Sequence, residues 1–78
     1  MWYVYVLKSE KDGKLYTGST NDLKRRLKEH NDGRVESTKD RKPLDIVYYE
    51  AGLDEHKARM REQYLKTAWG KRYIKGRI

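Results

Sequence analysis

Five side chains in this sequence carry groups suited to catalysis and lie where the surrounding pattern predicts packing residues. They are two phenols, a guanidinium, an imidazole and a carboxylate, at Tyr5, Tyr16, Arg26, His30 and Glu62. Phenol, imidazole and carboxylate groups transfer protons or orient water, a guanidinium binds oxyanions through its planar fork, and a carboxylate is a ligand for hard cations. The sequence therefore predicts a functional site, provided that the fold brings these groups together.

Three segments that must position these groups have the composition of strands. Trp2 to Leu7 is an unbroken β-branched and aromatic run, which is typical of a strand buried on both faces. Asp12-Gly13 indicates a hairpin to a second strand over residues 14–18, paired antiparallel with the first. We expect a third strand from Leu44 to Glu50, after Pro43, and we expect Gly52 to end it.

Two helices are predicted between and after these strands. Asn21 is the expected cap of the first helix, which ends before Gly33. The second helix begins at Asp54 and runs to about Ala68, where Gly70 stops it.

The first helix turns only part of its charge toward the sheet. On a 3.6-residue wheel, Leu23 and Leu27 form the inner stripe, His30 projects within it, and Arg26 lies on its border. The cations expected on the far side are Lys24, Arg25 and Lys28. The alternative interpretation is that Arg26 extends along apolar surface and His30 is an ordinary core imidazole.

The second helix contains an acid on its apolar side. Its inner stripe consists of Ala58, Leu65 and Trp69. Glu62 falls inside that stripe, where a carboxylate is costly unless it is paired or bound to a metal. A structural ion pair with Arg26 or Arg61 is as compatible with the pattern as a functional site.

The hairpin places two phenols on one face of the sheet. If the turn is centred on Asp12-Gly13, Tyr16 lies opposite Ser9 and shares a face with Tyr5. Gly18 ends the second strand just before the helix, where a small residue lets a phosphate approach closely. Ordinary strand tyrosines are the alternative.

Composition limits the class of protein. The chain has 78 residues, no cysteine and a net charge of +7, so we expect one small domain over residues 1–78, without disulfides or thiolate zinc sites. No apolar run approaches the roughly 20 residues that span a bilayer, and the first residues lack the features of a signal peptide. We expect a cytoplasmic protein with no membrane partner.

The predicted fold class is α+β, a three-stranded antiparallel sheet flanked by helices in the order ββαβα plus a short, basic C-terminal helix over residues 71–78.

The excess of cations favours a polyanionic partner, nucleic acid first. Residues 63–78 carry five Lys or Arg and no acid. A solvated basic surface, and a mobile loop over residues 34–42, are the alternatives. The side chains expected to contact backbone phosphates are Arg34, Lys39, Arg41, Lys42, Lys71, Arg72 and Lys75.

The ordered set of motifs resembles the GIY-YIG nuclease superfamily, in particular its small, free-standing bacterial members. The two name-giving motifs correspond to Tyr3-Val4-Tyr5 and Tyr16-Thr17-Gly18. The family's helical arginine corresponds to Arg26, and the histidine or tyrosine one turn later to His30. The acidic residue corresponds to Glu62, and residues 66–72 look like the ending of the free-standing group.

The resemblance implies a divalent-metal-dependent endonuclease that hydrolyses phosphodiester bonds in DNA by one in-line displacement. Glu62 is then the protein ligand of Mg²⁺ or Mn²⁺, and Arg26 holds the phosphate. Tyr16 is the general base, while Tyr5 and His30 position the water, the phosphate or a phenol. RNA stays open as a substrate, because nothing in the sequence recognisably reads a 2′-hydroxyl.

The sequence also departs from the family pattern. Tyr3 replaces the first glycine, Ser19 replaces a lysine found in some relatives, and no asparagine follows Asn31. These departures leave open a catalytically degenerate nucleic-acid-binding module of the same fold. A subunit role is the third possibility, with the net −2 block over residues 43–62 docking on a basic tail. We recognise no DNA-recognition segment, so we expect low sequence specificity or a protein partner that supplies the target.

Overall fold

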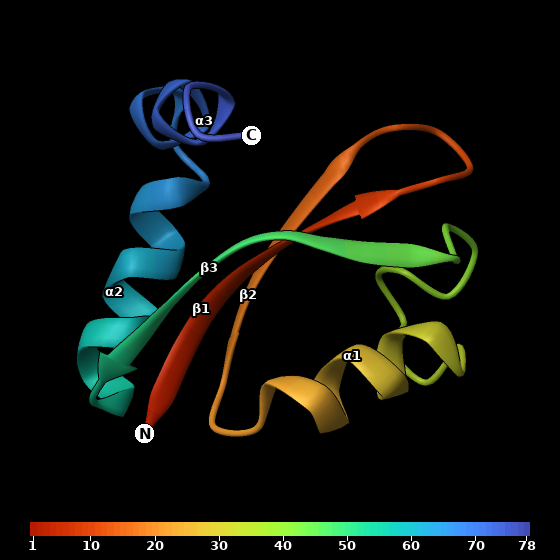
Figure 1. The fold of residues 1–78 in the computed structure, drawn as a ribbon, viewed down its shortest axis with the longest axis horizontal. Coiled ribbons are helices and arrows are strands. Elements are labelled where there is room, and N and C mark those ends of the chain that lie inside the picture. Colours follow the sequence, from red (N-terminus) through yellow and green to blue (C-terminus); the bar gives the residue numbers. More distant parts are fainter.

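A computed structural model describes all 78 residues and contains three strands and three helices. The strands form one antiparallel sheet in the order β2-β1-β3, with β1 in the centre (Figure 1). The α+β class and the order of elements are confirmed, although the basic C-terminal helix covers residues 68–75 and not 71–78. The elements are β1 (Trp2–Ser9), β2 (Leu15–Thr20), α1 (Leu23–Asn31), β3 (Leu44–Leu53), α2 (Glu55–Leu65) and α3 (Ala68–Lys75).

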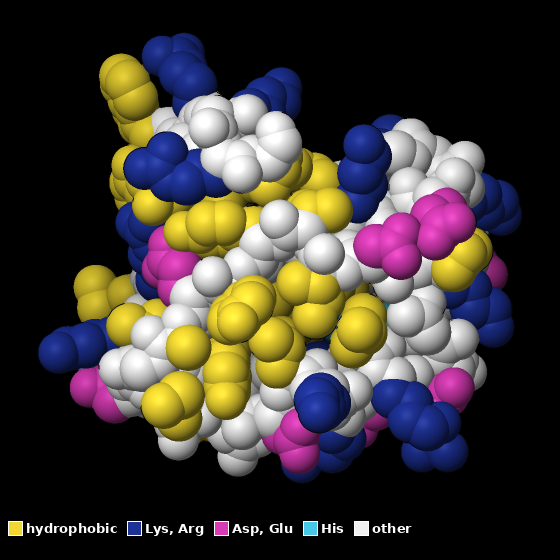
Figure 2. Space-filling model, in the orientation of Figure 1, with side chains coloured by type: hydrophobic (Ala, Val, Ile, Leu, Met, Phe, Trp, Pro, Cys, Tyr) yellow, Lys and Arg dark blue, Asp and Glu magenta, His cyan; other side chains and the backbone are white.

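The central strand divides the interior into two clusters, one on each face of the sheet. Because side chains alternate along a strand, Val4 and Val6 face one side and Tyr5 and Leu7 face the other. The first pair packs against α2 and α3, through Ala58, Leu65 and Ile74. The second pair packs against α1 and the start of β3, through Leu23, Leu27 and Leu44. Figure 2 shows hydrophobic side chains in the middle of one face of the molecule and charged ones around its margin.

The register of the hairpin differs from the prediction. Tyr16 lies opposite Leu7, not opposite Ser9. Ser9 instead pairs with Lys14, and its hydroxyl accepts hydrogen bonds from the backbone N–H of Lys11 and Asp12, which fixes a wider turn. The shift is two residues, so it leaves each side chain on its expected face.

The third strand continues past its predicted end. Gly52 does not end it, because β3 runs on to Leu53. The pairing with β1 shifts between Trp2 and Val4, and Gly52 lies in this irregular stretch with a φ of 83°. A glycine adopts this left-handed conformation without steric cost, so it lets the strand bulge and continue.

The second helix ends earlier than predicted. It stops at Leu65, and Thr67 begins α3 by accepting a hydrogen bond from the Gly70 N–H, 3.2 Å away. Gly70 therefore lies inside α3 and is not a stop. The helical period restarts after the break, which turns Trp69 outward with 68% of its surface exposed. The prediction that Trp69 belongs to the inner stripe is wrong for this reason.

The ends of α1 also differ in detail from the prediction. Its cap is Asp22, whose carboxylate accepts from the Arg25 N–H at 3.1 Å, and not Asn21. The segment after α1, where a mobile loop was the alternative, is anchored by Val35 and Thr38, which are both buried. No helix in the structure has the length and apolar character needed to cross a membrane.

Candidate active site

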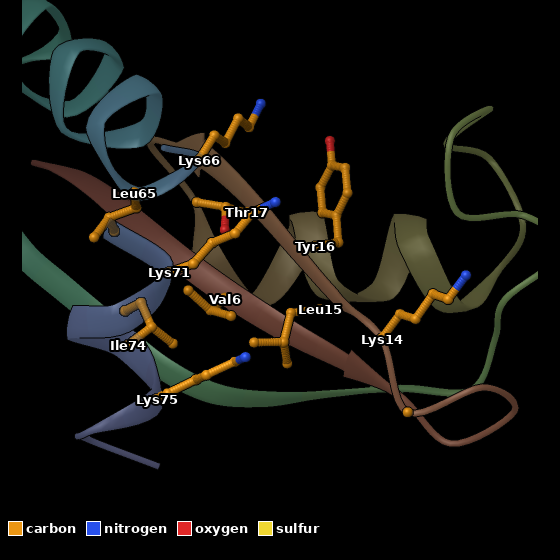
Figure 3. A pocket seen from close by; sticks show the side chains of 11 residues that line it. Val6, Lys14, Leu15, Tyr16, Thr17, Leu65, Lys66, Lys71, Ile74 and Lys75 are labelled. Carbon is orange, nitrogen blue, oxygen red and sulfur yellow. The ribbon is translucent and has the colours of Figure 1, made fainter. Parts of the chain in front are cut away.

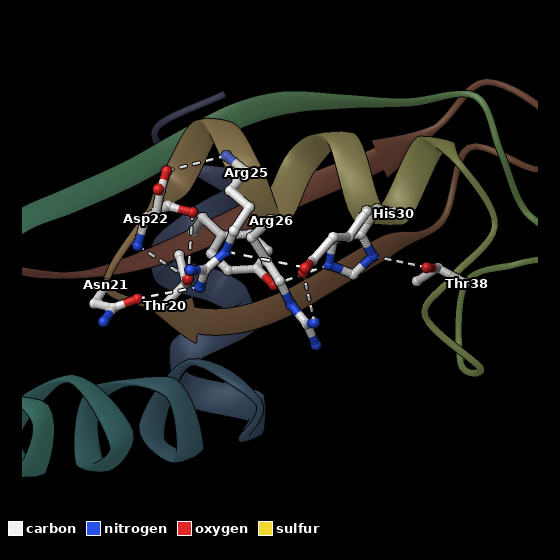
Figure 4. A network of polar contacts seen from close by, with 9 residues as sticks. Thr20, Asn21, Asp22, Arg25, Arg26, His30 and Thr38 are labelled. Atoms are coloured by element: carbon white, nitrogen blue, oxygen red, sulfur yellow. Dashed lines mark hydrogen bonds and ion pairs between the residues drawn. The ribbon is translucent and has the colours of Figure 1, made fainter.

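A buried hydrogen-bonded chain fixes one of the two predicted phenols. The Tyr5 hydroxyl lies 2.9 Å from Nε2 of His30, and Nδ1 of the same imidazole lies 2.7 Å from the Thr38 hydroxyl (Figure 4). Burial, with a smaller contribution from the nearby Arg26 cation, lowers the pKa of His30 to about 4. The imidazole is therefore neutral at physiological pH, and both of its nitrogens have a partner.

Tyr5 is held as a neutral phenol. Burial raises its pKa to about 12, and the hydrogen bond from Arg26 offsets only part of that effect. A group with this pKa remains protonated at neutral pH, so Tyr5 is suited to positioning a ligand and not to accepting a proton. His30 has no exposed surface, and its imidazole contacts this phenol.

Arg26 extends from α1 toward the edge of the sheet. One nitrogen of its guanidinium, Nη1, lies 3.1 Å from Glu29, and its side chain is 36% exposed. Burial opposes its charge, but hydrogen bonds to Tyr5 and Glu29 outweigh that effect and raise the pKa of Arg26. The group is thus a fixed cation at a partly accessible position, as an oxyanion site requires.

Glu62 approaches the same edge from the opposite face of the sheet. Its Oε1 accepts from the Ser19 hydroxyl at 2.5 Å, and its Oε2 pairs with the Lys66 ammonium at 2.7 Å. The alternative pairing with Arg26 or Arg61 is wrong, because Arg61 makes a bidentate pair with Glu50 instead. Lys66 follows Glu62 by four residues, and side chains at this spacing lie on the same face of a helix. The sequence alone therefore contains the signal for this ion pair.

A cavity of about 330 Å³ joins the two sides around the end of β2. Four of the five predicted residues line it, namely Tyr5, Tyr16, Arg26 and Glu62, while His30 lies behind them. Tyr16 stands beside His30, with ring centroids 5.0 Å apart. The cavity is also lined by Trp2, Gly18, Ser19, Thr20, Asn21, Arg25 and Arg59.

Gly18 makes room for a phenol. A Cβ atom at this position would lie 2.5 Å from the Tyr5 hydroxyl oxygen and 2.7 Å from its Cζ. Both distances are shorter than any stable contact, so only glycine leaves the space that the Tyr5 ring fills. The predicted phosphate contact at Gly18 stays a prediction.

Several residues of the cavity escape sequence reasoning. Arg25 was placed on the far side of the helix, yet it lines the cavity, where its Nη2 donates to Asn21 at 3.2 Å. Arg59 reaches the cavity from α2. Thr38, which holds His30, lies in a polar stretch without any period, so no signal in the sequence marks it.

The other predicted phosphate contacts lie outside this cavity. Lys39 pairs with Glu36 at 3.1 Å, and Arg41 lies 3.4 Å from Asp12 with much of its guanidinium buried. Lys71 and Lys75 line a second cavity. The remaining side chains of this group are Arg34, Lys42 and Arg72, and the last of these stacks on Trp69.

The carboxylate of Glu62 fits a hard divalent cation. It is the only acid that lines the cavity, and its side chain is 21% exposed. The structure contains no group of three or more His, Asp or Glu side chains that together form a metal site. A single carboxylate suits Mg²⁺, which keeps several waters and takes further ligands from a substrate phosphate.

Comparison with known proteins agrees with this arrangement. A family model described as the GIY-YIG catalytic domain matches residues 1–75. A UPF0213 protein of Clostridium perfringens is 46% identical over 67 residues, which cover 85% of this chain and 71% of that protein. A UPF0213 protein of Bacillus pumilus is 42% identical over 66 residues, covering 83% of this chain and 66% of that one.

A solved structure shares the fold. The solution NMR structure of a UPF0213 protein from Bacillus halodurans matches with a TM-score of 0.58 and 32% identity, over 97% of this chain and 84% of that one. The name UPF0213 specifies no activity. The family match over nearly the whole sequence, with the fold described above, shows that the chain belongs to the GIY-YIG family, whose catalytic domain implies nuclease activity.

Proposed function

We propose that this chain is a divalent-metal-dependent endonuclease that hydrolyses phosphodiester bonds in DNA with low sequence specificity. The observation that carries the proposal is the cavity at the end of β2. It is lined by a guanidinium and two phenols from one face of the sheet and by the Glu62 carboxylate from the other. Residues 1–78 act as one nuclease domain in this proposal.

The cationic side of the cavity binds the scissile phosphate. Arg26 presents two parallel N–H donors, which match two non-bridging oxygens of a phosphodiester. Arg25 adds a second positive charge at the rim. Tyr5, which His30 and Thr38 hold in place, donates a hydrogen bond from its hydroxyl to a phosphate oxygen or to the attacking water.

Tyr16 is the proposed general base. It lines the cavity and is only half-buried, whereas burial raises the pKa of Tyr5 to about 12 and keeps that phenol protonated. Tyr16 first gives its own proton to solvent, and the resulting phenolate takes a proton from water as the water oxygen bonds to phosphorus. The opposite P–O bond breaks in line, and solvent protonates the leaving oxygen.

Glu62 would hold Mg²⁺ or Mn²⁺. Such an ion neutralises charge on the phosphate and lowers the pKa of bound water. The Ser19 hydroxyl orients Oε1 of the carboxylate, and Lys66 lies on Oε2. Lys66 also supplies a cation on this side of the cavity, where some family members have a lysine at the position of Ser19.

A plasmid-nicking assay tests the proposal. Purified protein is incubated with supercoiled DNA and Mg²⁺ or Mn²⁺, and we expect nicking that EDTA stops. Glu62→Gln should abolish it, because the amide lacks the charge that holds the cation. Glu36→Gln is the matched control, since Glu36 is 87% exposed and pairs only with Lys39. Equal nicking by the wild type and Glu62→Gln would refute the proposal.

One observation favours a second candidate, a nucleic-acid-binding module without catalysis. Both oxygens of Glu62 already have protein partners, Ser19 and Lys66, which leaves the carboxylate satisfied without a cation. This candidate predicts salt-sensitive DNA binding that neither EDTA nor Glu62→Gln changes. Metal-dependent nicking that disappears in Glu62→Gln excludes it.

A further inference from the structure

A second cavity, of about 520 Å³, lies between β2 and α3 on the face of the sheet that carries Glu62. Its floor is apolar and is formed by Val6, Leu15, Leu65 and Ile74 (Figure 3). We call it the β2–α3 groove. Its size falls in the range of ligand pockets, roughly 300–1,000 Å³.

The rim of the β2–α3 groove is lined by lysines and by no acid: Lys14, Lys66, Lys71 and Lys75. Figure 3 shows Lys71 and Lys75 extending from α3 across the floor toward β2. Three of the four, Lys14, Lys71 and Lys75, form no ion pair in the structure, and only Lys66 is paired, with Glu62. Lys14, Lys71 and Lys75 therefore bring together three positive charges that no acidic side chain neutralises.

The groove adjoins the candidate active site. Tyr16 lines both cavities, and Lys66 lines the groove while its ammonium contacts Glu62 at the first cavity. A strand whose phosphate lies at Arg26 and Glu62 thus meets the groove as it passes Tyr16. The other cations predicted to bind phosphate line neither the groove nor the cavity of the candidate active site.

We propose that the β2–α3 groove binds the sugar–phosphate backbone of the substrate strand on one side of the scissile phosphate. This inference rests on the proposed function, because it extends that site along the strand. Nucleic acid alternates charged phosphates with sugars and bases that have apolar faces. The lysine rim and apolar floor match that alternation, and the continuity with the phosphate site favours nucleic acid over an acidic peptide.

The proposal separates cations that look equivalent in sequence. Lys71 and Lys75 bind the strand, whereas their neighbour Arg72 lies outside the groove, with its guanidinium over the Trp69 ring at 5.1 Å. The helical period causes this difference, since residues four apart share a face and the residue between them does not. A charge-matched control is therefore available on the same helix.

Fluorescence anisotropy with a labelled DNA oligonucleotide, in EDTA, measures binding without cleavage. We compare the wild type, Lys71→Ala/Lys75→Ala and the control Lys57→Ala/Arg72→Ala, which removes the same charge away from the groove. Losing two phosphate contacts should weaken binding by roughly 25- to 60-fold near 0.1 M salt and make the negative slope of log K against log salt shallower by about 1.4–1.8. The control should keep the wild-type slope, and Lys71→Arg/Lys75→Arg should restore binding.

The outcomes separate this inference from the proposed function. Equal losses in the two double variants would mean that only net charge matters and would overturn the groove. Unchanged binding by Lys71→Ala/Lys75→Ala would overturn it as well, and an acidic peptide would then become the occupant to test. If the wild type fails to nick plasmid but the groove variants lose binding selectively, the groove stands and the endonuclease proposal fails. Circular dichroism confirms folding of each variant.

Discussion

The contact between Gly18 and Tyr5 predicts that the smallest possible substitution at residue 18 damages both stability and activity. In Gly18→Ala the new methyl group would lie 2.5 Å from the Tyr5 hydroxyl oxygen and 2.7 Å from Cζ. Ordinary van der Waals contact begins at 3.4 Å, so the ring must move by nearly 1 Å. The ring is buried and packs in the cluster with Leu7 and Leu44, so a shift of that size disturbs its packing there.

The expected cost has two parts. Overpacking a core by one methyl group costs about 1–3 kcal/mol. Moving the phenol also breaks its hydrogen bond to His30 and leaves a buried nitrogen unsatisfied, at about 1–3 kcal/mol. A total near 2–6 kcal/mol is a large share of the roughly 5–15 kcal/mol that stabilises a typical protein. Even 2 kcal/mol lowers Tm by roughly 8–16 °C in a domain of this size.

Urea and thermal unfolding, followed by circular dichroism, measure this cost. Gly76→Ala is the control, because a Cβ there meets its nearest atom at an ordinary 3.5 Å. Tyr5→Phe removes the atom in closest contact, so Gly18→Ala should cost less in that background than in the wild type. Equal, small costs at residues 18 and 76 would refute the view that Gly18 exists to accommodate the phenol.

Three further predictions concern the interior. The pKa of His30 is about 4 in the folded chain and about 6.5 in the unfolded chain. Between these pH values the unfolded chain binds a proton that the folded chain does not bind. The free energy of unfolding should therefore fall by up to about 3 kcal/mol as the pH drops from 6.5 to 4. Urea unfolding across this range checks it, and a His30→Gln variant that shows the same decline would contradict the assignment. Thr38→Val removes the partner of His30 Nδ1 and should cost about 1–3 kcal/mol, measured in the same way against Ser37→Ala on the exposed part of that segment. Gly70→Ala places a Cβ 2.2 Å from the Tyr64 carbonyl oxygen and should destabilise the fold by about 2 kcal/mol or more, which lowers Tm by roughly 8 °C or more. A Tm within about 2 °C of the wild type would show that α2 and α3 separate without cost.

The sheet and most of the site were predictable because their signals are periodic. The face shared by Tyr5 and Tyr16 survives a register error of two residues, since side-chain direction repeats every second residue. The bias of Arg26 toward the sheet followed from its place next to the Leu23 and Leu27 stripe. The short motifs also predicted membership of the GIY-YIG family, which the fold and the family match confirm.

Other features depend on contacts between distant segments and had no local signal. The end of α2 is set by Thr67, which caps α3, and by Gly70, which packs closely on the preceding turn. A wheel drawn through that break places Trp69 on the wrong side. The partner of Glu62 was also missed, because Arg61, the nearest arginine in sequence, lies on Glu50 instead.

The division of the candidate site between two faces of the sheet has a consequence for protein synthesis. Both phenols, both arginines of α1 and the imidazole belong to the first 31 residues, whereas the carboxylate arrives with residue 62 and docks through α2. Under the proposed function, a nascent or stalled chain that has emerged only through α1 carries phosphate-binding groups but no carboxylate, so it cannot cut the nucleic acid near the ribosome. Under the same proposal, the chain becomes able to hydrolyse a phosphodiester only when α2 has docked on the sheet and brought Glu62 to the site.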